Sequence, residues 1–261
     1  MSTYRSGRHE FGQNFLTDRA TIDTIVRLVS HTDGPIIEIG AGSGALTLPL
    51  ERLTRPIAAI EIDPRLAQTL RGRVGALTTV VCADFLRYRL PRRPYVIVGN
   101  LPFHQTTSIL RRLLHADAWS AAVLLTQWEV ARRRAGVGGA TMMTAQWWPW
   151  YEFALVGRVP AKAFTPQPGV DGGVMTVTRR PAPLVDPARR RHYQSLVHSV
   201  FTGKGRGLEQ ILHRAAGPDV RRAVRKWLAE QEFRRSTLPR DLTPEQWSAL
   251  FGIIDRSPGR R

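Results

Sequence analysis

The sequence predicts an α/β fold, in which helices cover both faces of a mainly parallel sheet, followed by a small all-helical domain. Over the first part of the 261 residues, short β-branched apolar runs alternate with segments of helical apolar spacing. Such alternation is typical of parallel strands joined by crossover helices. After Pro181, Pro183 and Pro187 interrupt the chain, only helical patterns remain. We therefore expect a first domain over residues 1–180 and a helical domain over residues 181–261.

The individual elements follow from local patterns. Strands are assigned to short apolar runs that are rich in β-branched residues, at 35–39, 57–62, 78–82, 95–98, 121–125, 154–159 and 173–177. Helices are assigned to longer segments with apolar residues three or four apart, at 15–30, 45–53, 64–73, 107–114, 188–201, 208–214, 219–233 and 244–254. Thr17 or Asp18 is expected to cap the first helix, and Pro64 suits the first turn of the third.

Charge is the strongest compositional signal. The chain has 38 lysines and arginines against 21 acids, a net charge of +17, and its pI is about 11.4. Such an excess favours a polyanionic partner such as a nucleic acid. An arginine-rich proteome from a GC-rich genome is the alternative explanation. It accounts for the choice of arginine over lysine better than for the excess over acids.

Several classes of protein are disfavoured by the composition. No stretch approaches the roughly 18 consecutive apolar residues of a membrane helix, and residues 1–10 have no apolar segment typical of a signal peptide. The single cysteine, Cys82, excludes an internal disulfide and suggests a reducing compartment. No cluster of metal ligands stands out. We expect a monomeric cytoplasmic protein with no membrane and no metal partner.

A glycine-rich turn follows the first predicted strand. The segment from Glu38 to Gly44 reads Glu-Ile-Gly-Ala-Gly-Ser-Gly and leads into a helix. Glycines allow the backbone to approach a ligand closely. By itself the turn is equally compatible with a dinucleotide site or a purely structural turn. Its glycine spacing differs from the dinucleotide fingerprint, in which the last glycine comes three residues after the second.

Two further acids sit at the ends of the next predicted strands. Glu61 ends the second strand, where a carboxylate can accept both hydroxyl groups of a ribose, and Asp84 follows the third, where it can accept from the amino group of an adenine ring. Ligands of open α/β sheets bind at the carboxyl ends of the strands. Together with Glu38, these acids indicate a ligand that contains adenosine.

The fourth predicted strand ends in Asn100, Leu101, Pro102 and Phe103. This sequence resembles the signature of N6-adenine methyltransferases. The exocyclic amino group of adenine is a poor nucleophile, because its lone pair is delocalised into the ring. Acceptors on the Asn100 side chain and the Leu101 carbonyl would favour the pyramidal nitrogen of the transition state. Pro102 stiffens the turn, and Phe103 offers a face on which an extruded adenine can stack.

The N-terminal segment sharpens the resemblance. Residues 11–16, Phe-Gly-Gln-Asn-Phe-Leu, look like a motif of the rRNA adenine dimethyltransferase superfamily. The resemblance implies a Rossmann-like class I methyltransferase sheet and the cofactor S-adenosyl-L-methionine. The cofactor contacts that it implies are Asn14, Leu16, Gly40, Glu61, Asp84 and Asn100.

Two later segments favour one branch of that superfamily. Residues 164–174, Phe-Thr-Pro-Gln-Pro-Gly-Val-Asp-Gly-Gly-Val, and residues 201–207, Phe-Thr-Gly-Lys-Gly-Arg-Gly, resemble their counterparts in Erm enzymes. Those enzymes methylate one adenine of 23S rRNA and block macrolide, lincosamide and streptogramin B antibiotics. The alternatives are a 16S rRNA adenine dimethyltransferase, an RNA-binding protein with a vestigial cofactor site, and a DNA adenine methyltransferase. Phe103 stands where many relatives have tyrosine, so both mono- and dimethylation stay open.

Candidate RNA contacts follow from the arginine pattern. Basic residues that flank the proposed site or belong to the helical domain are Arg8, Arg111, Arg112, Arg132, Arg133, Arg134, Lys204 and Arg206. We place the run 132–134 in a loop beside the reaction centre. The aromatic cluster Trp147, Trp148, Trp150 and Tyr151 is expected to pack in a core or between domains rather than to bind RNA, because tryptophans are usually well buried.

Overall fold

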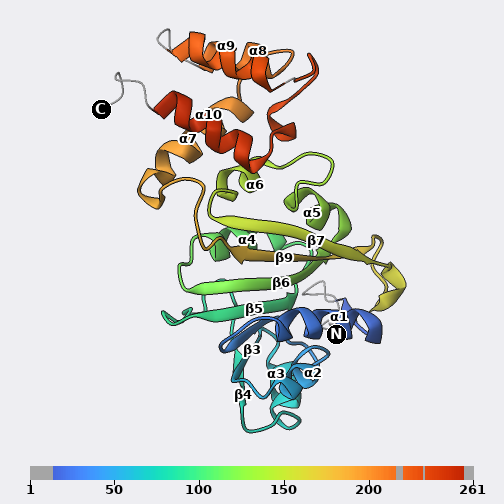
Figure 1. Ribbon diagram of the computed structural model, residues 1–261. Coiled ribbons are helices and arrows are strands. Elements are labelled where there is room, and N and C mark those ends of the chain that lie inside the picture. Colours follow the sequence, from blue (N-terminus) through green and yellow to red (C-terminus); the bar gives the residue numbers. More distant parts are fainter. Residues whose placement is uncertain (1–13, 216–219, 232, 256–261) are drawn as a thin grey trace, which may run out of the picture. The chain divides into compact units, whose positions relative to one another are not determined.

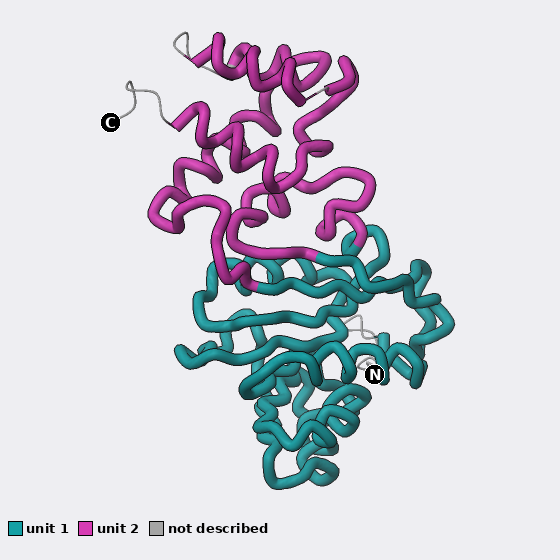
Figure 2. Tube along the Cα trace, in the orientation of Figure 1, with its two compact units in different colours: residues 1–131, 154–178 teal, residues 132–153, 179–261 magenta. Residues whose placement is uncertain are grey.

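The computed structural model describes residues 14–215, 220–231 and 233–255 (Figure 1). Two compact units divide the chain (Figure 2). Unit 1 consists of residues 1–131 and 154–178, and unit 2 of residues 132–153 and 179–261. The boundary near residue 180 lies close to the expected one, but residues 132–153, which the sequence analysis placed in the first domain, belong to unit 2.

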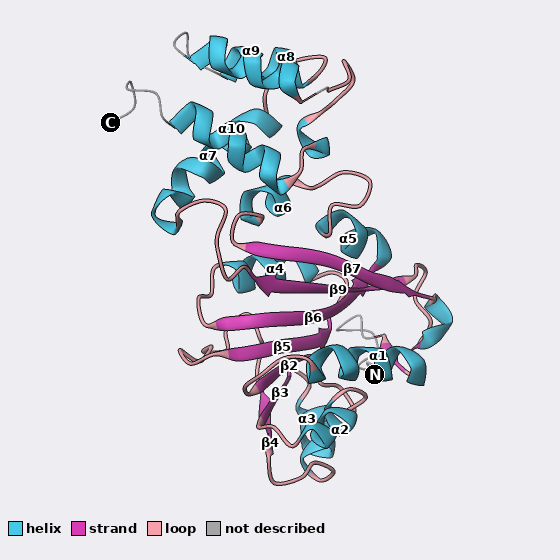
Figure 3. Ribbon diagram, in the orientation of Figure 1, coloured by secondary structure: helices cyan, strands magenta, loops and turns pink. Residues whose placement is uncertain are grey.

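A mixed seven-stranded sheet forms the centre of the fold, in the order β4-β3-β2-β5-β6-β9-β7 (Figure 3). Its strands are β2 (Ile36–Ile39), β3 (Ile57–Glu61), β4 (Thr78–Cys82), β5 (Tyr95–Asn100), β6 (Trp119–Gln127), β7 (Tyr151–Val159) and β9 (Gly172–Arg179). The pairs β4–β3, β3–β2, β2–β5 and β5–β6 are parallel, and β9 is antiparallel to β6. The predicted α/β class and the predicted strands are confirmed.

The register of the parallel strands brings their carboxyl ends into one row. Ile39 pairs with Ile60 on one side and with Gly99 on the other, and Glu61 pairs with Cys82. The segments that follow these strands therefore lie together at one edge of the sheet, where ligands of such folds bind.

The helices of unit 1 are α1 (Arg19–Ser30), α2 (Thr47–Leu50), α3 (Pro64–Arg71), α4 (Thr106–Leu114) and the start of α5 (Trp128–Arg134). Asp18 caps α1, since its carboxylate accepts from the Thr21 backbone N–H at 2.8 Å. Ile25 and Val29 on α1 are buried in the core against the sheet. Figure 3 shows α1, α2 and α3 on the near face and α4 on the far face. Helices on both faces were predicted.

The first helix starts later than its apolar pattern indicated. Phe15–Leu16 forms strand β1, which pairs antiparallel with β8 (Phe164–Thr165) in a separate two-stranded sheet. Periodicity alone could not distinguish these two apolar residues from the start of the helix, because their partner strand lies about 150 residues away. The region 45–53 is also less regular than expected, with α2 followed by a short 3-10 helix, Glu51–Leu53.

Unit 2 contains α6 (Met142–Trp147), α7 (Arg190–Phe201), α8 (Leu208–Ala215), α9 (Arg221–Glu230) and α10 (Pro244–Asp255). Tryptophans explain why residues 132–153 group with these helices. The rings of Trp147, Trp150, Tyr193 and Phe251 form a chain of contacts with centroids 5.4–6.2 Å apart. The Tyr193 hydroxyl donates to the Ala145 carbonyl at 2.9 Å. The predicted packing role of the tryptophan cluster is confirmed.

Candidate functional site

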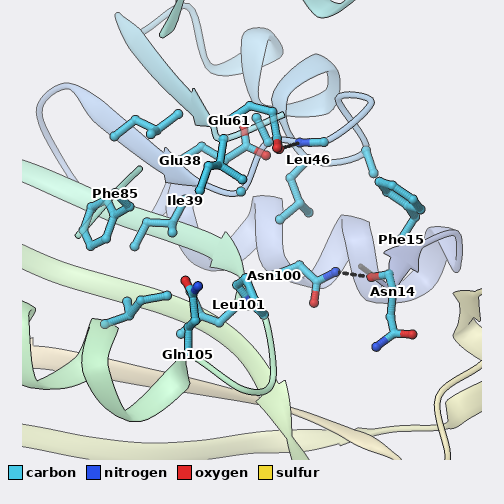
Figure 4. Close-up of a pocket in the computed structure, with 18 of the residues that line it drawn as sticks. Asn14, Phe15, Glu38, Ile39, Leu46, Glu61, Phe85, Asn100, Leu101 and Gln105 are labelled. Atoms are coloured by element: carbon cyan, nitrogen blue, oxygen red, sulfur yellow. Dashed lines mark hydrogen bonds between the residues drawn. The ribbon is translucent and has the colours of Figure 1, made fainter. Parts of the chain in front are cut away.

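A pocket opens at the carboxyl edge of the parallel strands (Figure 4). Its walls come from the segments after β2, β3, β4 and β5, and from β1. All of these belong to unit 1. The proposed cofactor and catalytic residues that line it are Asn14, Leu16, Gly40, Glu61, Asp84, Asn100, Leu101, Pro102 and Phe103. The structure therefore brings together side chains that are up to 89 positions apart in the sequence.

Glu61 is buried beside the glycine-rich turn, with only 2% of its surface exposed. One carboxylate oxygen accepts from the Gly42 backbone N–H at 2.6 Å and the other accepts from the Asp63 N–H at 2.8 Å. These bonds compensate for the cost of burying the charge. They also fix the carboxylate relative to the turn, while each oxygen retains a lone pair for a ligand.

The glycine-rich turn requires glycine for two reasons. Gly42 has a φ of +56°, a conformation that other residues rarely adopt. A Cβ at this position would also lie 3.2 Å from the Phe15 ring. Phe15 comes from β1, so the turn and the N-terminal segment pack closely at the pocket.

Glu38 is the second buried carboxyl group of the pocket, with 1% exposure. Burial raises its pKa to about 8, a hydrogen bond from the Thr47 hydroxyl at 2.6 Å opposes the rise, and the neighbouring Glu61 adds to it. Near neutral pH, Glu38 is therefore mainly protonated. A neutral carboxyl group here avoids the repulsion of two buried charges and can donate a hydrogen bond.

Asp84 occupies the wall after β4. One of its oxygens accepts from the Leu86 backbone N–H at 2.8 Å, and the next residue, Phe85, is buried and lines the pocket. Arg112 on α4 fixes this segment from behind: it donates to the carbonyls of Leu86 and Tyr88, and its guanidinium lies over the Phe85 ring at 5.8 Å. Arg112, predicted as an RNA contact, thus has a set of internal partners.

Asn100 is positioned by backbone contacts on both sides. Its Nδ2 donates to the Asn14 carbonyl at 2.7 Å (Figure 4). Only the amide nitrogen can donate to a carbonyl, so the orientation of the amide is defined and Oδ1 remains as an acceptor. A Cβ on the preceding Gly99 would lie 2.6 Å from the Ile39 carbonyl, so glycine is needed for β5 to approach β2.

Phe103, in the turn after Asn100, forms an aromatic pair with Phe164 of β8. Leu101 donates its N–H to the Leu125 carbonyl at 2.8 Å, and its side chain is buried. Phe103 is half-buried, and its ring meets the Phe164 ring edge to face, with centroids 6.3 Å apart. Phe164 was not among the predicted site residues. Its place in the motif at 164–174 was the available signal, but the pairing of β8 with β1 was needed to locate it.

Some of the predicted RNA contacts are exposed in the structure, and others have hydrogen-bond partners within the protein. Arg8 lies outside the described residues. Arg111, Arg133, Lys204 and Arg206 are exposed. Arg132 donates to the Val137 carbonyl at 3.0 Å and Arg134 donates to the Thr141 hydroxyl at 2.7 Å. The expectation that residues 132–134 form a loop was wrong, because they make up the last turn of α5.

A groove with basic walls lies between α8 and α9 in unit 2. Its lining residues are Glu209, Gln210, His213, Arg214, Arg221, Val224, Arg225 and Leu228. The Arg214 guanidinium donates to the Lys204 carbonyl at 2.8 Å, which ties the loop with Lys204 and Arg206 to the groove. Lys204 and Arg206 of the loop were predicted from the sequence, but His213 and Arg214 were missed because nothing local distinguishes them from a solvated helix face.

No helix of the described residues is long and apolar enough to cross a membrane. In the same residues, no group of three or more His, Cys, Asp or Glu side chains is arranged to bind a metal ion.

Comparisons with known proteins agree with this geometry. The family described as "Ribosomal RNA adenine dimethylase" matches residues 4–255. An rRNA adenine N-6-methyltransferase of Corynebacterium diphtheriae is 57% identical over 215 residues, which cover 82% of this chain and 85% of that protein. The mycinamicin-resistance protein MyrB of Micromonospora griseorubida is 48% identical over 98% of this chain and 81% of its own length. The crystal structure of the 23S rRNA methyltransferase ErmE matches with a TM-score of 0.85 and 36% identity, over 93% of this chain and 100% of that one.

Proposed function

The chain belongs to the ribosomal RNA adenine dimethylase family, and we propose that it methylates the N6 amino group of a single adenine in 23S rRNA. Its fold is that of a class I methyltransferase. Ribosomes that contain the methylated adenine would be resistant to macrolide, lincosamide and streptogramin B antibiotics. The similarity to a mycinamicin-resistance protein and to ErmE supports this reading over methylation of 16S rRNA.

The residues of the pocket fit S-adenosyl-L-methionine, which supplies an activated methyl group when bound. Glu61 offers two fixed carboxylate oxygens for the ribose hydroxyls. Asp84 offers an acceptor for the adenine amino group, and the apolar side chains of Ile60 and Phe85 line the same pocket. Asn14, Leu16, Gly40 and Asn100 complete the proposed cofactor contacts.

The orientation of Asn100 is the observation that carries the proposal. Because Nδ2 is held by Asn14, Oδ1 is the branch that can accept from an amino group in the pocket. The Leu101 carbonyl is the second proposed acceptor. Two fixed acceptors would hold both N–H bonds of the target amino group and offset the positive charge that develops on its nitrogen.

Phe103 supplies a place for the target base. Its ring lines the pocket with Asn100, and the buried Phe164 ring, which does not line the pocket, supports it by an edge-to-face contact. An adenine that is extruded from an RNA loop can stack on such a ring. We propose that Phe103 stacks the base and that the buried Phe164 ring supports Phe103, in addition to the roles assigned to Leu101 and Pro102.

The two units have different proposed tasks. Residues 1–180, without 132–153, would bind the cofactor and catalyse the transfer, and residues 181–261, together with 132–153, would bind RNA. Unit 2 has 21 of the 38 lysines and arginines but 9 of the 21 acids. The exposed candidates for phosphate contact are Arg111, Arg133, Lys204, Arg206 and the walls of the groove between α8 and α9. A monomer acting in the cytoplasm, where rRNA is available, completes the proposal.

Methylation of protein-free 23S and 16S rRNA transcripts tests the proposal. The transcripts are incubated with labelled S-adenosylmethionine, and the modified base is mapped by primer extension. We expect label on a single adenine in the peptidyl-transferase loop of 23S rRNA. Label on adjacent adenines of 16S rRNA would assign the chain to the other branch, and absence of label from both would contradict the enzymatic proposal.

A further inference from the structure

The wall segment, residues 84–88, follows β4 and carries Asp84 and Phe85, which both line the pocket. In Figure 4 Phe85 lies at the opposite end of the pocket from Asn14. The wall segment forms a turn that is neither helix nor strand. Backbone of this kind needs partners for its polar groups from elsewhere in the protein. These partners therefore decide where two side chains of the pocket lie.

Asp84 binds the N–H groups of its own turn. Its Oδ1 accepts from the Leu86 N–H at 2.8 Å, and its backbone carbonyl accepts from the N–H groups of Arg87 and Tyr88, both at 2.9 Å. The carbonyls of Leu86 and Tyr88 instead accept from the guanidinium of Arg112 on α4, the first of them at 2.8 Å. Arg112 and Asp84 are therefore linked through a single residue, Leu86.

Arg112 also supports the Phe85 ring. Its guanidinium carbon lies 5.8 Å from the centroid of this ring, which is only 5% exposed. A cation over an aromatic face adds an electrostatic attraction to the packing. One side chain thus contacts the wall segment at three residues. Lysine or glutamine could not reproduce the set, because the planar fork of arginine is needed to reach two carbonyls and to lie over a ring.

The neighbouring arginine on α4 has different surroundings. Arg111 is exposed and lines a surface depression together with Ser108 and His115. Arg112 reaches the same depression, but its Nε is buried and both terminal nitrogens donate to the wall segment. A two-pronged contact with phosphate requires N–H groups that face outward. The adjacent arginines therefore differ in what their guanidinium groups can bind.

We propose that Arg112 is a positioning residue for the cofactor: it holds the wall segment so that Asp84 and Phe85 fit the adenine ring, and it does not bind RNA. The inference rests on the proposed function, because it takes S-adenosyl-L-methionine as the ligand and Asp84 as the acceptor for its amino group. Arg112 does not line the pocket, so it acts through the wall segment rather than on the cofactor itself.

The test compares Arg112→Gln with two matched controls. Arg111→Gln removes the same charge from the same turn of α4. Arg55→Gln removes an arginine that also holds a loop of unit 1, but away from the pocket. The carbonyls that accept from Arg55 are those of Val29, Thr32 and Gly34, none of which lines the pocket. For each protein we would measure the Kd for S-adenosylmethionine by calorimetry, Tm, and the salt dependence of binding to an rRNA fragment.

Arg112→Gln should raise the cofactor Kd about tenfold, which corresponds to the loss of one hydrogen bond to a charged group. The slope of log K against log salt for RNA should not change. Arg111→Gln and Arg55→Gln should keep the cofactor Kd within about twofold, and Arg55→Gln should lower Tm instead. If Arg112→Gln does not fold, Arg112→Lys replaces it, since lysine keeps the charge and can still donate to one carbonyl.

Three results would overturn the proposal. The first is an unchanged cofactor Kd in the Arg112 variant. The second is an RNA salt slope that falls by about 0.7–0.9, the value for one phosphate contact. The third is an equal rise of the cofactor Kd in Arg55→Gln, because the effect would then reflect a general loss of stability.

A pair of ligands tests the route through Asp84. S-inosylhomocysteine has an oxygen in place of the amino group of S-adenosylhomocysteine, so it lacks the proposed donor to Asp84. The wild type and Arg55→Gln should prefer the adenosyl compound, and Arg112→Gln should prefer it less, because Asp84 is no longer held in place. A merely structural role would weaken the binding of both ligands equally.

The outcomes with these ligands separate the inference from the proposed function. An equal preference in the wild type and in Arg112→Gln would overturn the positioning role and leave the proposed function intact. A wild type without any preference would refute the contact between Asp84 and the amino group, and with it the inference. A wild type that binds neither ligand would refute the proposed cofactor site itself.

Discussion

The two compact units use their charged residues in opposite ways. In unit 1 the carboxyl groups of Glu38 and Glu61 are almost completely buried, and each has a defined hydrogen-bond partner at the pocket. In unit 2 the excess charge is basic, and much of it lies on helix surfaces. The hydrogen bonds of the buried carboxyl groups in unit 1 fix the positions of single atoms, whereas the basic surface of unit 2 produces a positive electrostatic field. Methyl transfer to one amino group needs atoms at fixed positions, whereas attraction of a polyanion needs only a positive field.

Arginines within unit 2 illustrate the limit of this contrast. Arg189 pairs with Asp255, and Arg190 lies over the rings of Trp147 and Trp150, with its guanidinium 5.2 Å from each centroid. These two arginines stabilise the packing of α7. Lys204 and Arg206 are exposed instead. A run of basic residues in the sequence therefore combines packing groups with surface groups.

The largest effect is expected at the pocket, from Asn100→Ala. Loss of the acceptor at Oδ1 should lower kcat by about 10²–10³-fold, the usual cost of one transition-state hydrogen bond. The affinity for S-adenosylmethionine, measured by calorimetry, should stay within several-fold. Gln127→Ala is the matched control, because Gln127 ends β6 at the same edge of the sheet but does not line the pocket. Activity retained by Asn100→Ala would contradict the role of this amide.

Glu61→Gln should act on binding rather than on turnover. The amide can replace only part of the acceptor set, so one charge-assisted bond to the ribose or to the Gly42 N–H is weakened. We expect the Kd for S-adenosylmethionine to rise about 10–100-fold. Glu51→Gln is the control: Glu51 also accepts from a backbone N–H, that of Gly75 at 2.7 Å, but does not line the pocket. Equal effects of the two substitutions would show that Glu61 merely stabilises the fold.

The comparison also explains how far the sequence could predict the site. Glu61 and Asp84 were identified because one ends and the other follows a parallel strand, and the carboxyl ends of such strands meet at one edge. Asn100 was identified from the methyltransferase signature that it begins at the end of the fourth predicted strand. Phe164 was missed because its position depends on β8, which pairs with a strand near the N-terminus. No local pattern records such a long-range pairing. Residues 132–153, expected in the first domain, group with unit 2 for a similar reason, since Trp150 packs on Tyr193 of α7.

Arg225→Gln tests whether RNA binds at a defined place on the basic surface of unit 2. Arg225 lines the groove between α8 and α9, whereas Arg222, which is also exposed and on the same helix, does not. If phosphate occupies the groove, Arg225→Gln should weaken RNA binding several-fold. The slope of log K against log salt should also fall by about 0.7–0.9, the value for one phosphate contact. Arg222→Gln should change this slope less. Identical slopes for the two variants would mean that the charge acts only as a diffuse field.

The smallest effect on activity is expected from Glu38→Gln, which should change stability instead. The pKa of Glu38 rises from an ordinary value of 4.5 to about 8 on folding, so between these pH values the folded state binds more protons than the unfolded state. Stability of the wild type should therefore fall as pH rises through this window, by at most about 1.4 kcal/mol per pH unit from this group. Gln keeps the acceptor for the Thr47 hydroxyl but does not titrate.

Thermal unfolding of both proteins from pH 5 to pH 8 measures the difference. The variant should lose less Tm than the wild type over this range and should equal or exceed it at pH 8. An identical pH dependence would mean that Glu38 is ionised in the folded protein, beside Glu61. The pocket would then contain two buried negative charges. The contrast between a pocket with one buried, hydrogen-bonded charge and the diffuse positive field of unit 2 would have to be revised.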